Sequence, residues 1–124
     1  MSTSGTFTFT DNVDSYHVYV HWDCYPTGAA EYLEATLQAG KVWELPRFEA
    51  DEFSAGFVAT VKNNGGNVRL VNGTIEQGNH DYDYHVFKVN HELSVSVSSG
   101  GIHNVLFIGS LKDFIERGAA LLEE

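Results

Sequence analysis

The residues most suited to chemistry lie together between His21 and Pro26, in the stretch HWDCYP. This stretch places an imidazole, a carboxylate and a thiol close together, and a second imidazole, His17, lies four residues upstream. A transition metal would need these side chains to converge. Residues four apart on a strand are separated by roughly 13 Å, and structural zinc sites usually contain several Cys and His ligands. We therefore expect no metal and no other cofactor. The candidate ligands are His17, His21, Asp23 and Cys24.

Cys24 is the only cysteine and a candidate nucleophile. A catalytic thiol needs a lowered pKa and a nearby base, which a following helix N-terminus and His21 could supply. No glycine-rich oxyanion loop accompanies Cys24, and a lone cysteine is more often a buried apolar side chain. We therefore expect no catalytic residues, and a small metal- or thiol-dependent enzyme stays as an alternative.

The aromatic residues of the same stretch are expected to be structural. We predict that Trp22 and Tyr25 pack in the core where a strand meets a helix, because large aromatic rings contribute much buried area. We also predict that His21 and Asp23 hydrogen-bond to the backbone of this turn. The HWDCYP stretch is then a fold element rather than an active site.

A second notable stretch, NHDYDYHV, runs from Asn79 to Val86 and alternates polar with aromatic residues. On a strand this spacing places the acidic side chains of Asp81 and Asp83 on one face and Tyr82 and Tyr84 on the other. With the aromatic face buried, the acidic face is either solvated or a contact surface for a basic partner.

The overall charge is −10, from seven basic and seventeen acidic residues. Such a surface disfavours direct contact with a phosphate backbone. Acidity also serves solubility alone in many proteins. The acids are densest in residues 1–46, which carry six acids and one base. The residues expected to contact a partner are Asp11, Asp14, Asp23, Glu31, Glu34, Glu44, Asp81 and Asp83.

Hydrophobic periodicity indicates an α+β fold. Alternation over residues 6–10 and 16–22 predicts a hairpin. Residues 29–39 suggest a helix that Thr27 caps and Gly40 ends. Apolar residues that recur with a period of 3.6 residues predict a second helix over 49–62. We expect the core residues of this helix to be Phe53, Phe57, Val58 and Val61.

From residue 67 onward, apolar and polar residues alternate with a period of two residues. Four short runs with turn residues between them predict a four-stranded antiparallel meander. Ser110 and Asp113 form the S-x-x-D start of a closing helix, in which Gly118 is a weak point. We therefore expect an antiparallel sheet, made of the hairpin and the meander, with two central helices and a C-terminal helix packed on it.

Length and composition predict one domain over residues 1–124, with residues 1–5 disordered. No apolar run approaches the ~18 residues that span a bilayer, and one cysteine suits a reducing compartment. We expect a cytoplasmic protein without membrane or direct nucleic-acid contact, and a homodimer is an arrangement that the sequence leaves open.

Three stretches resemble a group of small uncharacterised proteins encoded by phages and prophages. They are VYVHWDCYPTGAAEYL, ELPRFEADEFSAGFVA and VRLVNGTIEQGNHDYDYHVF. The hallmarks of that group are an H-W-D-G-Y-P stretch and a later G-(N/D)-x-(D/E)-Y-x-Y strand. Cys24 stands where that pattern has Gly, so this turn does not use glycine's access to positive φ at that position. The resemblance covers about residues 6 to 97 and implies a bacterial cytoplasm and an accessory role toward a host.

Charge and resemblance together favour one functional hypothesis. The protein is expected to bind and inhibit a host protein with a basic surface, such as a nucleic-acid-binding defence complex of the CRISPR or restriction type, by nucleic-acid mimicry. A module that sequesters a small ligand such as a nucleotide, in a pocket between the meander and the second helix, is the main alternative.

Overall fold

The computed structural model describes residues 3–39, 48–71, 81–99 and 104–123. Its strands are β1 (Gly5–Thr10), β2 (Ser15–Val20), β3 (Val68–Val71), β4 (Tyr82–Val89), β5 (Glu92–Ser99) and β6 (Asn104–Ser110). Its helices are α1 (Pro26–Gln38), α2 (Ala50–Asn63) and a C-terminal helix. The C-terminal helix consists of α3 (Leu111–Asp113), a π-helical turn η1 (Phe114–Gly118) and α4 (Ala119–Leu122).

The strands form one six-stranded sheet in the order β3-β2-β1-β4-β5-β6. The fold class is α+β as predicted, and every neighbouring pair is antiparallel except β1 with β4, which is parallel. The predicted four-stranded meander is wrong. Only β4, β5 and β6 form a meander, because β3 pairs with β2 at the far edge of the sheet. Period-two alternation defines the faces of a strand and not its neighbours.

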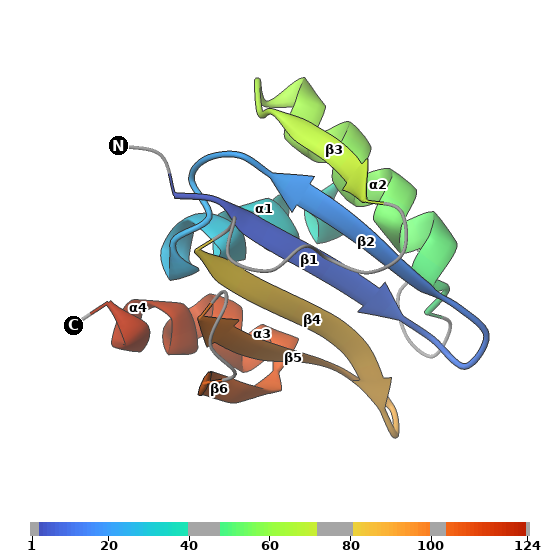
Figure 1. Cartoon of the computed structure of the whole chain (residues 1–124). Helices are drawn as coiled ribbons and strands as arrows, with labels where there is room; N and C mark the ends of the chain where they lie inside the picture. The colour runs from blue at the N-terminus through green and yellow to red at the C-terminus, as the bar shows by residue number, and fades with distance from the viewer. Residues whose placement is uncertain (1–2, 40–47, 72–80, 100–103, 124) are drawn as a thin grey trace.

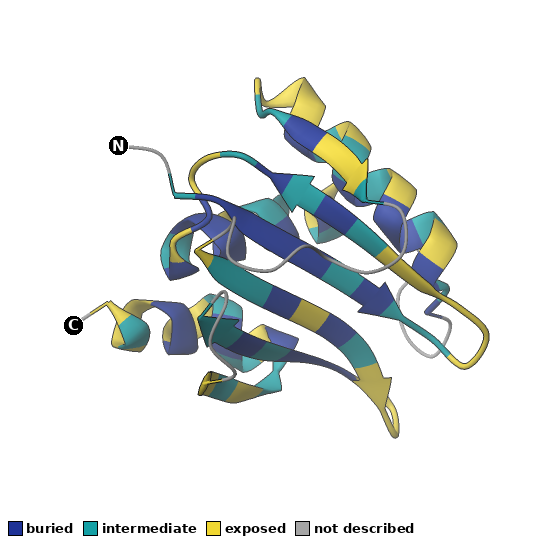
Figure 2. Ribbon diagram, in the orientation of Figure 1, coloured by how far each residue is buried: buried dark blue, intermediate teal, exposed yellow. Residues whose placement is uncertain are grey.

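The helices pack on one face of the sheet, which is the far face in Figure 1. On β1, Phe7 and Phe9 point to the helices and are fully buried, whereas Thr8 and Thr10 on the opposite face are partly exposed. The same alternation appears along the central strands in Figure 2. It follows that one sheet face holds the core and the other carries polar side chains.

The core centres on contacts between β1 and α2. The Phe7 and Phe57 rings lie 4.6 Å apart between centroids, and Phe9 and Phe53 lie 5.3 Å apart. The predicted stripe of α2 is confirmed for Phe53, Phe57 and Val61, which are fully buried. Val58 lies at the margin and is only partly buried. Ring pairs at these separations add to the stabilisation from area burial.

The N-terminal segment differs from the expectation of disorder over residues 1–5. The carbonyl oxygen of Thr3 accepts a hydrogen bond from the backbone N–H of Cys24 at 3.0 Å, and that of Ser4 accepts from the N–H groups of Asp81 and Tyr82. β1 begins at Gly5. The prediction is therefore wrong for residues 3–5, because backbone pairing with two distant segments orders a small polar stretch that has no hydrophobic signal of its own.

The start of α1 also differs from the expectation. Thr27 does not cap it. Pro26 is the first helical residue, which suits its fixed φ, and the side chain of the preceding Tyr25 makes no capping bond. Instead the backbone N–H of Thr27 donates to Oε2 of Glu123 at 2.6 Å. A carboxylate from the end of the C-terminal helix therefore satisfies the first turn of α1. Gly40, the predicted end, lies outside the described residues.

The C-terminal helix begins as predicted. Oγ of Ser110 accepts a hydrogen bond from the backbone N–H of Asp113 at 3.0 Å. Gly118 has a packing role that sequence reasoning missed, since a Cβ at this position would come within 2.7 Å of the Phe107 ring. The glycine lets the helix approach β6 closely. No helix among the described residues is both long and apolar enough to cross a membrane.

Candidate functional site

The turn between β2 and α1 contains HWDCYP, but its aromatic residues are not in the core. The side chains of Trp22 and Tyr25 are each 40% exposed, which corrects the prediction that both are buried. β2 ends at Val20, so the strand alternation that would direct Trp22 inward stops before it. Asp23 has φ of +64°, a left-handed conformation that is uncommon for non-glycine residues. The sharp turn therefore directs these aromatic rings outward.

The other side-chain contacts of this turn also differ from the expectation. Nδ1 of His21 lies 2.9 Å from the hydroxyl of Tyr19, so the imidazole bonds to a side chain rather than to the backbone of the turn. The side chain of Asp23 is exposed. The backbone N–H of His21 donates to the carbonyl oxygen of Asn67. The main-chain groups of the turn therefore bond both to other main-chain groups and to the hydroxyls of Tyr32 and Tyr84.

Cys24 takes the buried position in this turn. It is fully buried, and its Sγ lies 3.5 Å from the carbonyl oxygens of Val20 and Trp22. Burial raises the pKa of the thiol, and the negative charges of Asp23 and Asp81 raise it further. The thiol therefore stays protonated at neutral pH and is poorly suited to be a nucleophile. The interpretation of Cys24 as a buried small apolar side chain is confirmed.

The histidines proposed as metal ligands have separate partners. Nδ1 of His17 lies 3.0 Å from Oγ1 of Thr8 on the open sheet face, while His21 contacts Tyr19 beyond the end of that strand. Within the described ranges, no three His, Cys, Asp or Glu residues are grouped so that they could hold a metal ion. The four candidate ligands are thus not brought together by the fold.

Two of the carboxylates predicted to contact a partner instead accept hydrogen bonds from the protein's own backbone. Oδ1 of Asp11 accepts hydrogen bonds from the N–H groups of Val13 and Asp14, and Oδ2 accepts from Ala50 N–H at 2.8 Å, at the start of α2. These bonds to Asp14, Ala50 and Val13 lower the pKa of Asp11. Oδ2 of Asp81 accepts from the N–H of Ser4 at 2.9 Å. Both carboxylates therefore hold backbone segments in place.

The other candidate acids are dispersed. Asp14 lies in the β1–β2 turn, Asp23 lies at the opposite end of the hairpin, and Glu31 and Glu34 lie on the exposed side of α1. Asp83 is half-buried on the open face of β4, in register with Thr6 and Ser98. Glu44 lies outside the described residues. The candidates that lie within the described residues do not form one continuous acidic patch.

The open sheet face carries a hydroxyl and imidazole network beside Asp83. Nε2 of His85 lies 2.9 Å from Oγ1 of Thr10, which is itself 2.6 Å from Oγ of Ser15. Burial lowers the pKa of His85, and the charge of His17 lowers it further. The two imidazoles flank Thr8 in one row across β2, β1 and β4. This face is polar and hydrogen-bonded within itself.

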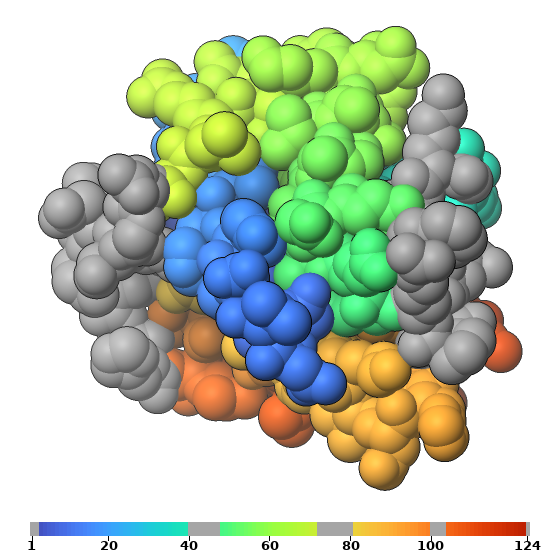
Figure 3. Space-filling view, turned by 90° about the vertical axis from the view of Figure 1, so that its right-hand side faces the viewer, coloured from blue at the N-terminus to red at the C-terminus, as the bar shows by residue number. Residues whose placement is uncertain are grey.

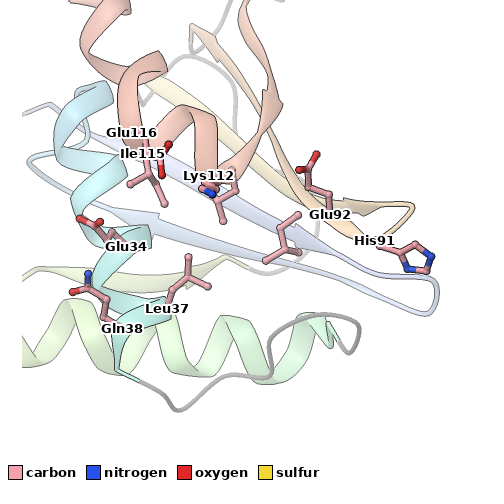
Figure 4. Close-up of a pocket in the computed structure, with 10 residues that line it drawn as sticks. Glu34, Leu37, Gln38, His91, Glu92, Lys112, Ile115 and Glu116 are labelled. Carbon is pink, nitrogen blue, oxygen red and sulfur yellow. The ribbon is translucent and has the colours of Figure 1, made fainter.

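One exposed candidate, Glu34, borders a groove between α1 and the C-terminal helix, which we call the α1–α3 groove (Figure 4). Its volume is about 570 Å³. α1 forms one side, α3 and η1 form the other, and the β4–β5 turn lies at one end. The apolar side chains that line the groove are Leu37, Leu93, Leu111 and Ile115.

Acidic residues predominate around the α1–α3 groove. Glu34 comes from α1, Glu92 from the start of β5 and Glu116 from η1. The basic residues of the lining are Lys112 and His91. Sequence reasoning missed Glu92 and Glu116, because three carboxylates on distant elements share no local spacing. The sequence feature that pointed toward this groove was the apolar residue Leu37, one helical turn after Leu33. An apolar floor with an acidic rim can hold an amphipathic cationic segment.

Comparisons with known proteins place the chain in no group. No family model matches it, no curated protein matches it, and no solved structure matches it.

Proposed function

We propose that this protein is a non-enzymatic binding protein that docks a basic, amphipathic segment of another protein in the α1–α3 groove and so blocks that partner. The observation that carries the proposal is the combination of an apolar floor with three rim carboxylates from three elements. Apolar burial supplies affinity in such a contact, while the carboxylates select for positive charge and speed association.

The net charge of −10 supports the same partner chemistry. A strongly acidic protein attracts basic surfaces over distances comparable to the Debye length, about 10 Å at 0.1 M salt. Together with the resemblance of HWDCYP to phage-encoded proteins, the charge favours a host protein in the bacterial cytoplasm as the partner. Host complexes that bind nucleic acid have basic surfaces of this kind.

The arrangement of the acids favours a protein segment in a groove over mimicry of a phosphate backbone. Mimicry would need an array of exposed carboxylates with free oxygens. Asp11 and Asp81 instead accept hydrogen bonds from backbone N–H groups, and Asp83 is half-buried on β4. The other candidates that the structure describes are spread over both ends of the hairpin and α1. A nucleotide is also disfavoured in the α1–α3 groove, because its phosphates would face three carboxylates.

A peptide titration tests this proposal. The probe is a helical peptide with leucines on one face and lysines on the other, and its controls are the same composition scrambled and the same pattern with glutamates for lysines. We expect saturable binding of the amphipathic cation only, with amide NMR shifts at Leu37 and Ile115. The affinity should fall as salt rises. Equal binding of the scrambled peptide would overturn the proposed groove.

Matched charge reversals locate the contact. Glu34→Lys with Glu116→Lys changes the rim of the groove, whereas Asp14→Lys with Asp51→Lys changes the net charge equally at exposed positions elsewhere. We expect the rim pair to weaken binding by about tenfold or more. The control pair should change affinity by less than about threefold. Similar losses for both pairs would show that only net charge matters and would refute the groove.

A further inference from the structure

β6 forms one edge of the six-stranded sheet, and β3 forms the other. Among the described strands, β6 pairs with β5 alone. The outer side of an edge strand presents backbone N–H and C=O groups that can pair with a further strand. β6 lies at the bottom and β3 at the top in Figure 1, and Figure 3 shows the yellow-green β3 at the top with the orange β4–β5 hairpin at the bottom. The sheet can therefore be extended at β6 independently of β3.

The apolar side chains of β6 are exposed to an unusual degree. Val105 is 59% exposed, Leu106 37% and Ile108 68%. Val105 is in register with Ser98 and Ile108 with Ser96, so both side chains lie on the open sheet face. Leu106 is the extra residue of a β-bulge, because the register between β5 and β6 shifts at this point. An edge strand that presents aliphatic side chains to water is suited to pair with another strand.

The exposed apolar surface continues from β6 onto the neighbouring strands. A shallow groove of about 470 Å³ lies beside Ile108, and its apolar lining also includes Phe87 and Val89 of β4. Val89 is 47% exposed. Apart from His91 and Glu92, the groove is lined by uncharged residues. The open face beside the β6 edge is therefore an apolar strip that a further strand would partly cover.

The distribution of charge identifies the kind of strand that fits this edge. Residues 93–111, which include the whole of β6, contain no Asp, Glu, Lys or Arg, and this is the longest such run in a chain of net charge −10. Edge strands are commonly protected from pairing by charged residues, above all Lys. A basic partner finds no carboxylate on β6, whereas two copies of this acidic chain can meet there without like charges in direct contact.

We infer that two copies of this chain associate by antiparallel pairing of their β6 strands about a twofold axis. The two sheets then form one continuous sheet, and Val105 and Ile108 of each copy pack beside those of the other on the open face. A twofold axis suits this edge, because the same uncharged strand supplies both sides of the contact. The inference goes beyond the proposed protein contact and does not depend on it, since no residue of β6 lines the α1–α3 groove.

Sedimentation equilibrium of the full chain at two salt concentrations is the first test. We expect a monomer–dimer equilibrium with a dissociation constant on the order of 10–100 μM, because one strand pair is a small interface and the bulge at Leu106 interrupts it. Salt should strengthen the dimer by about threefold or more between 50 and 500 mM, because it screens the repulsion between two acidic chains. Binding of a basic segment in the α1–α3 groove should weaken over the same range, so the two proposals can fail separately.

Matched lysine substitutions on the two edge strands provide the control. Ile108 on β6 is 68% exposed and Leu70 on β3 is 79% exposed, so a lysine should be tolerated at either position and changes the net charge equally. Ile108→Lys should weaken dimerisation by about tenfold or more, because two ammonium groups meet at the axis. Leu70→Lys should change it by less than about threefold. Val105→Lys is a second variant on the open face of β6 and should act like Ile108→Lys.

Amide hydrogen exchange locates the contact. Exchange at β6 should slow by about threefold or more between dilute and concentrated protein, while exchange at β3 should not change. The inference is overturned if the chain stays monomeric at about 500 μM in 500 mM salt, if the dimer weakens as salt rises, or if Ile108→Lys and Leu70→Lys dimerise equally. It is also overturned if the chain is monomeric and benzoyl-phenylalanine at position 108 captures a different protein, because the edge then belongs to another partner.

Discussion

The hydroxyl of Tyr84 donates a hydrogen bond of 2.6 Å to the main-chain carbonyl oxygen of Cys24. Tyr84 is 1% exposed and lies on β4, within the YDYH stretch, while Cys24 lies in HWDCYP. The bond therefore connects the two most distinctive stretches of the sequence, 60 residues apart. Both stretches therefore contribute to one buried structural joint, which holds the β2–α1 turn against β4.

Removal of this hydroxyl should destabilise the fold. Tyr84→Phe leaves the Cys24 carbonyl oxygen buried without this donor, and we expect a loss of about 1–3 kcal/mol in the free energy of unfolding. Urea denaturation measures the change. The matched control is Tyr82→Phe, because Tyr82 is only partly buried and should cost less than about 0.5 kcal/mol. Equal effects of the two substitutions would argue against the joint.

Alkaline pH should unfold the protein through buried tyrosines. Burial, with smaller effects from nearby negative groups, raises the pKa of Tyr32 from 10.0 to about 12 and raises that of Tyr84 further. The folded state therefore keeps protons that the unfolded state releases, so the contribution of these tyrosines to stability is fully present below pH 10 and is lost as pH rises above it. Denaturation curves across this range should show a shallower fall for Tyr84→Phe. An unchanged pH dependence would contradict this prediction.

Asp11 should contribute to stability through its bonds to the hairpin turn and to α2. Asp11→Ala removes the acceptor of the Ala50 N–H and two bonds in the turn, and we expect a loss of about 1–2 kcal/mol in the free energy of unfolding. Because the folded pKa of Asp11 lies below 3.8, its contribution is present above that value and is lost as pH falls through the folded pKa. Asp14→Ala is the control and should have a smaller effect.

The contact between α2 and the sheet should dominate the core. Phe57 is fully buried against Phe7, Phe9 and Tyr32. Phe57→Ala should lower the free energy of unfolding by ~3–5 kcal/mol, through lost transfer energy and a cavity. The neighbouring Val58 is only partly buried, so Val58→Ala should cost clearly less. A change below about 1 kcal/mol for Phe57→Ala would place this helix outside the core.

Sequence patterns predicted the features that depend on neighbouring residues. The stripe of α2, the cap formed by Ser110 and the two faces of β4 follow from helix and strand periods, and the structure confirms them. The partners of the strands depend on distant contacts. The alternation of apolar and polar residues within a strand does not indicate which strand lies beside it. The sequence therefore did not reveal that β3 pairs with β2 or that β1 pairs in parallel with β4. Trp22 was misplaced because the strand ends two residues earlier than its alternation suggested.

The candidate contact surface was predicted less well for the same reason. Net charge indicated an acidic contact, and Glu34 was named among its residues. Glu92 and Glu116 reach the α1–α3 groove only because the β4–β5 turn and the C-terminal helix fold against α1. Asp11 and Asp81 were named for their charge, but their hydrogen bonds to backbone N–H groups show a folding role that no local pattern encodes.

Photo-crosslinking from the α1–α3 groove tests the central proposal most directly. Gln38 lines this groove and is exposed, so it can be replaced by photoreactive benzoyl-phenylalanine, and Asn63 at the end of α2 is the control position. After irradiation in a bacterial extract, mass spectrometry identifies the crosslinked partner segment. We predict a basic segment with apolar residues at helical spacing, captured from position 38 only and lost when Glu34→Lys and Glu116→Lys are added. A neutral or acidic segment, or equal capture from position 63 or with the reversed charges, would contradict the proposal.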